Sequence, residues 1–359
     1  MAALALFATF GPQTRRALKV HAALLCTFLI APLLAEGALR ICIAGNIANL
    51  RNAKLFADSL SDNDHWKLRK LWKGTARVAP DPLFGWSTPK TAKNPLGVIR
   101  LHGYEPQTKN VVLCFGDSFM EGVTPFPHKI PDQLEERLEE QTVYNYGVGG
   151  YGVGQMYLRF LADHSQYVDP TIVVGIMTRD LDRSILSVRG SPKPRFRVTG
   201  GKLALEKFDS SLDAESWRTN NPPTIRSYLL AMAIQRWRRL AAGGNVMELD
   251  YRREEKQQVN RAIIAGFIDE ARAHDLRLLF VILPTSKNVE RTGWRTEFLR
   301  ETFKEFKVPF VDGGKALRAD MRKTSRKSEL YFLPDNHPNE MGNGVFADAI
   351  AERIVKLLK

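Results

Sequence analysis

The sequence predicts an α/β protein, a three-layer α/β/α sandwich with about five parallel strands. Short continuous apolar runs at 111–115, 171–177 and 276–283 have the length and composition of strands that are buried on both faces. Between these runs, apolar residues recur every three or four positions, which is typical of amphipathic helices. The alternation of the two patterns indicates a parallel sheet covered by helices on both faces.

The other expected elements complete this pattern in chain order. A helix begins near residue 130, a strand covers 142–146 and a short helix covers 154–164. After the strand at 171–177 the sequence predicts, in turn, a hairpin over 195–205 around Gly200-Gly201, helices over 224–241 and 252–274, the strand at 276–283, a helix over 294–306, a strand over 308–311 and a closing helix over 341–358.

Composition also divides the chain into successive parts. We expect a tail and an apolar helix over 1–45, a helical neck and an irregular, Pro-rich linker over 46–104, the α/β domain in two parts over 105–182 and 251–359, and a basic insertion or lid over 183–250.

The apolar run near the N-terminus predicts a membrane helix. Residues 20–35 carry no charge and follow Arg15, Arg16 and Lys19. Sixteen helical residues span about 24 Å, and extension to Leu39 reaches the roughly 30 Å of a bilayer core. A cleaved signal peptide is the alternative, but the sequence around residue 35 lacks an Ala-x-Ala site, and apolar residues continue at helical spacing beyond it.

The basic residues before the run lie closer to it than those after it, which favours a cytoplasmic N-terminus. We therefore predict a single-pass protein of the inner (cytoplasmic) membrane whose folded domain lies outside the cytoplasm.

The charge balance restricts the partners. Lys and Arg number 52 against 39 Asp and Glu, a net charge of +13, which favours acidic lipid, anionic glycan or nucleic acid. No nucleic-acid-binding module is recognisable, so we expect no nucleic acid partner. The basic insertion is predicted to be a solvated face, with contact to an anionic glycan or the membrane surface as the alternative. Three cysteines without metal-ligand spacing exclude a disulfide scaffold and a zinc ribbon.

The first chemically informative segment is Gly116-Asp117-Ser118. It follows directly on the strand at 111–115, and ligands of open α/β sheets bind at the carboxyl ends of the strands. Glycine permits a sharp turn there. A serine hydroxyl is a weak nucleophile, so it needs an adjacent base to react.

The second segment is a glycine loop after the strand at 142–146. Its glycines let the backbone approach a reacting carbonyl and present an N–H group to it. Gly147, Gly149 and Gly152 also match the dinucleotide-binding pattern G-x-G-x-x-G. The strand before them is polar, however, and no acidic residue ends a strand about 20 positions later, so nucleotide binding is the weaker interpretation.

The third segment, 334–339, precedes the closing helix and contains Asp335 and His337. Histidine is the usual base for a serine hydroxyl, and a neighbouring carboxylate fixes its tautomer and stabilises its protonated form. Of the seven histidines, His337 is the one with a nearby carboxylate in a loop bounded by prolines.

Together, the three segments resemble the SGNH (GDSL-type) hydrolase superfamily, over about residues 108–182 and 258–359. The resemblance implies a flavodoxin-like sandwich in which Ser118 is the nucleophile, His337 the general base and Asp335 its orienting carboxylate. It also implies that the N–H groups of Ser118 and Gly150 bind the oxyanion. The apolar helix and the D-x-H-P-N ending resemble the membrane-anchored bacterial branch, some of whose members act on acetylated cell-envelope polysaccharides.

Two departures from the family pattern stand out. The asparagine that completes the family's oxyanion hole is replaced by Arg179, which is a candidate for binding the oxyanion or the substrate. Its charge could stabilise an oxyanion, but its longer, forked head fits a carboxylate or phosphate better. Asp180 and Arg183 are expected to hold that loop. The usual Asp-x-x-His spacing is shortened to Asp335-x-His337, a variant seen in other members, and Asp312 is the reserve candidate for the carboxylate.

The sequence thus predicts a membrane-anchored serine esterase, with its catalytic domain in the periplasm, that hydrolyses acyl esters of an envelope glycan or lipid, with acetyl the favoured acyl group. We expect no metal and no cofactor. Two alternatives stay open. The same chemistry could transfer an acetyl group onto a glycan hydroxyl, or the protein could bind glycan without catalysis.

Overall fold

The computed structural model describes residues 12–44, 79–100, 109–189, 191–212, 214–222, 226–241 and 252–359. The helical neck predicted within 46–104 falls largely on residues 45–78, which lie outside the described residues. Contacts divide the chain into two units, one that contains the N-terminal helix and one that contains the sheet.

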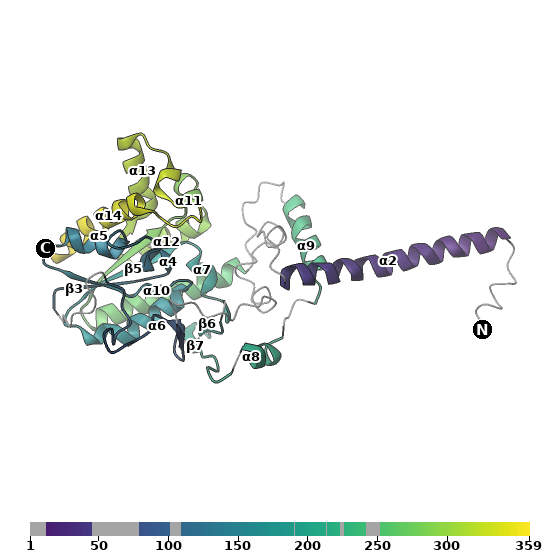
Figure 1. The fold of residues 1–359 in the computed structure, drawn as a ribbon, viewed down its shortest axis with the longest axis horizontal. Coiled ribbons are helices and arrows are strands. Elements are labelled where there is room, and N and C mark those ends of the chain that lie inside the picture. The colour runs from purple at the N-terminus through teal and green to yellow at the C-terminus, as the bar shows by residue number, and fades with distance from the viewer. Residues whose placement is uncertain are drawn as a thin grey trace. The chain divides into compact units, whose positions relative to one another are not determined.

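The sheet has five strands, and every neighbouring pair is parallel, which confirms the predicted fold class (Figure 1). In spatial order the strands are β4 (Thr142–Asn145), β3 (Val111–Gly116), β5 (Thr171–Met177), β8 (Arg277–Leu283) and β9 (Phe310–Asp312). The chain passes from β3 to β4 on one side and then crosses to β5 on the other. This reversal creates a crevice between the carboxyl ends of β3 and β5, the place where open α/β sheets bind ligands.

Side chains of the sheet alternate between two apolar layers. On β3, Val111, Leu113 and Phe115 belong to one buried cluster, and Val112 and Cys114 belong to the other. The first layer is covered by α6 (Val153–Asp163), α10 (Arg253–Ala273) and α12 (Trp294–Glu305), and the second by α5 (Ile130–Arg137), α13 (Gly313–Thr324) and α14 (Glu340–Leu358).

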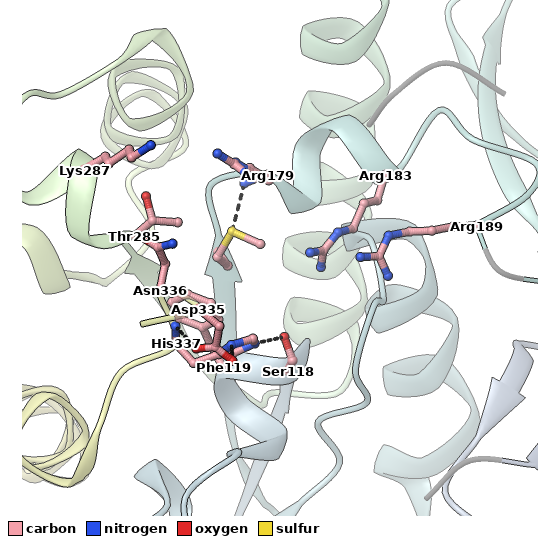
Figure 2. Close-up of a pocket in the computed structure, with 11 residues that line it drawn as sticks. Ser118, Phe119, Arg179, Arg183, Arg189, Thr285, Lys287, Asp335, Asn336 and His337 are labelled. Atoms are coloured by element: carbon pink, nitrogen blue, oxygen red, sulfur yellow. Dashed lines mark hydrogen bonds and ion pairs between the residues drawn. The ribbon is translucent and has the colours of Figure 1, made fainter. Parts of the chain in front are cut away.

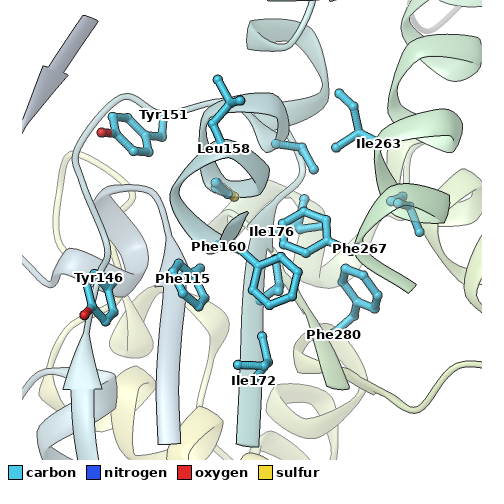
Figure 3. Close-up of a cluster of buried hydrophobic side chains, with 14 of the residues drawn as sticks. Phe115, Tyr146, Tyr151, Leu158, Phe160, Ile172, Ile176, Ile263, Phe267 and Phe280 are labelled. Carbon is cyan, nitrogen blue, oxygen red and sulfur yellow. The ribbon is translucent and has the colours of Figure 1, made fainter. Parts of the chain in front are cut away.

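Aromatic rings fill the first layer (Figure 3). Phe267 of α10 stacks on Phe160 of α6 at 5.2 Å between ring centroids and meets Phe280 of β8 edge-on at 5.8 Å. Such pairs stabilise a core beyond the burial of their area. The two helices are therefore fixed on the sheet by ring contacts near its centre.

Most of the predicted elements agree with the structure. The predicted hairpin is formed by β6 (Arg195–Thr199) and β7 (Lys202–Glu206), and the closing helix is α14. The last strand, β9, starts two residues later than the 308–311 predicted, at Phe310. The sequence prediction did not include α8 (Ala214–Asn220), α11 (Ser286–Glu290) or α13.

The Pro-rich segment predicted as an irregular linker is instead part of the core, and that expectation is wrong. Its strands β1 (Ala79–Asp81) and β2 (Gly85–Ser87) pair with each other, and Phe84 and Trp86 are buried. Arg159, which is 1% exposed, donates hydrogen bonds to Ser87 Oγ (2.7 Å) and Leu96 O (2.6 Å). The sequence did not predict this role because the prolines interrupt the regular spacing of apolar residues by which a buried strand or helix is recognised.

The other unit contains α2 (Pro12–Ala44) and α9 (Tyr228–Ala241). Glu36 of α2 accepts hydrogen bonds from Ser227 Oγ (3.0 Å) and from the backbone N–H groups of Tyr228 (3.0 Å) and Leu229 (2.8 Å). The carboxylate of one helix thus caps the N-terminus of the other. The predicted insertion over 183–250 is accordingly divided, since its later part packs with α2.

The buried ion pair between Arg159 and Asp163 gives a first prediction. Arg159→Leu leaves Asp163, which is 2% exposed, without its cation and lowers the free energy of unfolding by about 3–5 kcal/mol. Burial already raises the pKa of Asp163, and Arg159 opposes that rise. Without Arg159 the native state binds protons more readily than the unfolded state, so the loss of stability grows as the pH rises and shrinks as it falls.

Urea unfolding of the full-length chain in detergent, followed by tryptophan fluorescence between pH 5 and 8, measures this effect. The exposed Arg322→Leu on α13 is the matched control. Equal midpoints for the two variants at every pH would show that the pair does not stabilise the fold.

Candidate active site

Ser118 lies at the carboxyl end of β3, as the first residue of the short helix α4 (Ser118–Glu121). Asp117 precedes it in an extended conformation and caps this helix, since its Oδ1 accepts a hydrogen bond from Phe119 N at 2.9 Å. A Cβ at Gly116 would lie 2.5 Å from Met120 Cβ, so only glycine permits this tight turn. The turn holds Ser118 beside the crevice between β3 and β5.

The loop that carries His337 is fixed by its own hydrogen bonds. Leu333 N donates to His337 O at 2.8 Å, and Asn336 N donates back to Leu333 O at 2.9 Å. Ser286 of α11 holds the side chain of Asn336 through a 2.5 Å hydrogen bond. Asn339 caps α14 with its side chain. The D-x-H-P-N ending thus works as a folded loop joined to the start of the last helix.

The structure brings Ser118, His337 and Asp335 together (Figure 2). His337 Nε2 lies 2.9 Å from Ser118 Oγ, and His337 Nδ1 lies 3.0 Å from Asp335 Oδ2. The carboxylate oxygen lies off the direction of the Nδ1–H bond. With the proton on Nδ1 next to the carboxylate, Nε2 is the acceptor that faces the hydroxyl.

The short Asp335-x-His337 spacing has a geometric consequence. Asp335 Oδ1 accepts a hydrogen bond from the backbone N–H of His337 at 3.1 Å, while Oδ2 faces the ring. Partial burial raises the pKa of Asp335, but the hydrogen bond and the charge of His337 outweigh it, and the pKa lies below its ordinary value. The side chain is 61% exposed, so water also reaches this ionised carboxylate.

A buried ion network lies beside Ser118. Arg183, at the end of α7 (Asp180–Arg183), donates through one nitrogen to Asp117 Oδ2 (2.7 Å), Asp180 Oδ1 (2.6 Å) and Tyr151 O (3.0 Å). Burial and the charge of Asp117 raise the pKa of Asp180 well above its usual range, and Arg183 opposes this. The arginine thus joins the ends of β3 and β5 across the crevice, the role expected for Asp180 and Arg183.

The glycine loop packs tightly against α4. A Cβ at Gly147 would collide with the backbone N of Glu121, and Asn145 Nδ2 donates to Met120 O at 2.9 Å. A Cβ at Gly149 would lie 2.7 Å from Glu121 Oε2 and 3.8 Å from Ser118 Cβ, and Trp86 Nε1 holds Gly149 O at 3.0 Å. These glycines therefore serve the approach of the loop to α4. Trp86, which the sequence analysis missed, supports that loop from the β1–β2 segment.

Gly150, the predicted oxyanion donor, has a φ of +86°, and Arg189 Nη1 occupies the place where a side chain would begin. Within the described part of the chain, the backbone N–H groups of Ser118, Gly149 and Gly150 donate no hydrogen bond. Gly150 is not among the residues that line the cavity described next, and its role stays a prediction.

A cavity of about 230 Å³ opens in front of Ser118. It is lined by Ser118, Phe119, Met177, Arg179, Arg183, Arg189, Thr285, Lys287, Asp335, Asn336 and His337. Arg179 lies in its wall, but in Figure 2 its guanidinium is turned away from Ser118. Arg183, whose side chain is 11% exposed, and Lys193, which is 2% exposed, belong to the stretch predicted to be a solvated face, so that prediction is wrong for these two residues.

The reserve candidate Asp312 is engaged elsewhere. Its Oδ1 accepts from Lys315 N at 2.9 Å as the cap of α13, and Arg300 pairs with its other oxygen at 2.6 Å. It does not line the cavity. The carboxylate beside His337 is therefore that of Asp335.

No protein-family model matches the chain, and no curated protein matches it. Similar solved structures include a lipolytic protein of the G-D-S-L family from Veillonella parvula, 16% identical over 68% of this chain and 98% of that one, with a TM-score of 0.39. An acetylxylan esterase from Geobacillus stearothermophilus is 14% identical over 70% of this chain and 96% of that one, with a TM-score of 0.37.

The packing of the glycine loop gives a second prediction. In Gly147→Ala the new methyl group meets backbone atoms of α4, which cannot move aside cheaply. We expect a loss of about 1–3 kcal/mol in the free energy of unfolding and a longer distance between Ser118 Oγ and His337 Nε2.

Urea unfolding and a crystal structure of the variant measure both quantities. Gly314→Ala on α13 is the control, because its Cβ would meet only side-chain atoms, the nearest at 3.3 Å. An unshifted α4 with unchanged stability in Gly147→Ala would refute the proposed packing role.

Proposed function

We propose that this protein is a serine esterase of the SGNH type that hydrolyses acyl esters, with Ser118 as nucleophile, His337 as general base and Asp335 as orienting carboxylate. The observation that carries the proposal is the 2.9 Å contact between Ser118 Oγ and His337 Nε2, with a carboxylate 3.0 Å from the opposite ring nitrogen. A hydroxyl, an imidazole and a carboxylate in this order form the constellation that makes serine nucleophilic.

In the proposed reaction Ser118 Oγ attacks the ester carbonyl while His337 Nε2 takes its proton. The oxyanion that forms is stabilised by the backbone N–H groups of Ser118 and Gly150. His337 then gives the proton to the leaving alcohol, and the acyl group stays on Ser118. Water, activated by His337, releases the acid and restores the serine. Asp335 stabilises the positively charged imidazolium in both halves of the cycle.

The site favours catalysis over the non-catalytic alternative. That alternative depended on the missing oxyanion asparagine, yet the hydroxyl, the imidazole and the carboxylate are all in contact. A binding protein needs none of these. The glycan or lipid ester of the cell envelope, with an acetyl group favoured, enters the proposal from the family resemblance and the N-terminal helix.

We propose that α2 is an uncleaved membrane anchor. The helix is long and apolar enough over Pro12–Cys42 to cross a bilayer, by length and composition. It continues without a break through residue 35 to Ala44. Glu36, directly after the best candidate cleavage position at Ala35, caps the start of α9, and Arg40 donates to Glu36 at 2.8 Å. The chain past residue 35 is thus engaged as a helix that supports a second helix.

The triad gives a graded prediction. Ser118→Ala and His337→Ala lower the kcat for a short acyl ester by about 10⁴-fold or more, because nucleophile and base are lost. Asp335→Ala lowers it less, because the carboxylate is 61% exposed and water can take its place. The assay is the hydrolysis of 4-nitrophenyl acetate by the full-length chain in detergent, with unfolding midpoints to confirm the fold. Undiminished hydrolysis by Ser118→Ala would remove the mechanism.

The anchor is tested by the mass of the mature chain in a bacterial host. We expect peptides from residues 12–35 to be present and the protein to stay in the membrane fraction at high salt. Leu33→Ala creates an Ala-x-Ala site with Ala35 and serves as a cleavable control. A native chain that begins at residue 36 would identify a signal peptide instead.

A further inference from the structure

Cations outnumber anions around the cavity. Arg179, Arg183, Arg189 and Lys287 line it, and Asp335 is the one carboxylate that does so among the described residues. Arg183 is already neutralised by the buried pair of aspartates described above. Arg179 and Lys287 are not part of that network, and they add positive charge that the triad does not require.

Arg179 and Lys287 come from different parts of the chain and meet at this cavity. Arg179 follows β5, and Lys287 lies on α11. Both are exposed, and in Figure 2 their charged heads are turned toward one another across the cavity. Within the described residues, neither head has a carboxylate within ion-pair distance. Two like charges directed at one space repel each other until an anion lies between them.

Arg189 contributes positive charge from the opposite wall, where its guanidinium lies against Gly150. The charge of Arg189 also acts on the buried Lys193. Burial and, after it, the charges of Arg195, Arg189 and Arg183 lower the pKa of Lys193 to about 7. The positive charge of this stretch therefore also acts on a buried group that does not line the cavity.

From this arrangement we infer that the ester substrate carries a carboxylate in addition to the ester group that faces Ser118, and that Arg179 and Lys287 bind it. The inference rests on the proposed esterase function. A guanidinium donates two parallel hydrogen bonds to a carboxylate, and an ammonium adds a further charge-assisted bond. Arg179, at the position of the family's oxyanion asparagine, then has a different role. Its side chain binds the substrate's carboxylate, and backbone N–H groups bind the oxyanion.

The carboxylate can belong to the acyl group or to the alcohol, and matched substrates separate the two sources. On the acyl side, 4-nitrophenyl hemisuccinate is compared with 4-nitrophenyl butyrate. On the alcohol side, 4-acetoxybenzoate is compared with its methyl ester. We expect the charged ester of one pair to be hydrolysed with a kcat/KM about 10-fold or more above that of its neutral partner.

In the full-length chain in detergent, Arg179→Gln/Lys287→Gln reduces this preference, the ratio of kcat/KM for the charged ester to that for its neutral partner, to near unity. The control Arg322→Gln/Lys304→Gln removes the same charges from the exposed faces of α13 and α12 and keeps the preference. High salt weakens the preference in the native chain. Equal rates for the charged and neutral esters in both pairs would overturn the inference while the esterase proposal stands.

A binding measurement separates the two proposals. In Ser118→Ala, calorimetry with succinate or 4-hydroxybenzoate, the charged products, detects the carboxylate site without any turnover. Binding that is lost in Ser118→Ala/Arg179→Gln/Lys287→Gln supports the site, even if the native chain hydrolyses none of the four esters and the esterase proposal fails. Absence of binding by Ser118→Ala, or binding unchanged in the triple variant, contradicts it.

Discussion

The contact between Ser118 and His337 is the interaction on which the rest of the site depends, and it joins residues 219 positions apart. β3 lies in the interior of the sheet. The contact forms because the carboxyl end of β3 and the loop before α14 meet at the same edge of the sheet. Gly116 turns the chain sharply enough to present the hydroxyl, and the loop hydrogen bonds of Leu333 and Asn336 hold the imidazole in reach. Each side of the contact is fixed by its own local structure.

Buried charges fix the crevice around this contact. Arg183 lies between Asp117 and Asp180, two carboxylates with no exposed side-chain surface, at the ends of neighbouring strands. Removing one member of such a network leaves a charge in a medium that solvates it poorly, so the network resists rearrangement. The same arginine contacts the glycine loop through Tyr151 O. The network thus sets the spacing of the three segments that form the proposed site.

Much of this could be predicted from the sequence. The strand and helix periodicities gave the parallel sheet, and short motifs at its carboxyl edge gave Ser118, Asp335 and His337. The β1–β2 segment could not be predicted, because Phe84 and Trp86 are buried through single contacts with distant residues such as Arg159 and Tyr151 rather than through a periodic face. The meeting of Arg179 and Lys287 at the cavity could not be predicted, because Lys287 is separated from Arg179 by more than a hundred residues and belongs to no motif.

The covalent step tests the central claim most directly. Mass spectrometry of the native chain, quenched during turnover of a 4-nitrophenyl ester, should find the acyl group on the peptide that contains Ser118. The same peptide from His337→Ala should carry almost none, since its serine lacks a base. Acylation at another residue, or hydrolysis at full rate with no acyl group found on Ser118, would contradict the mechanism.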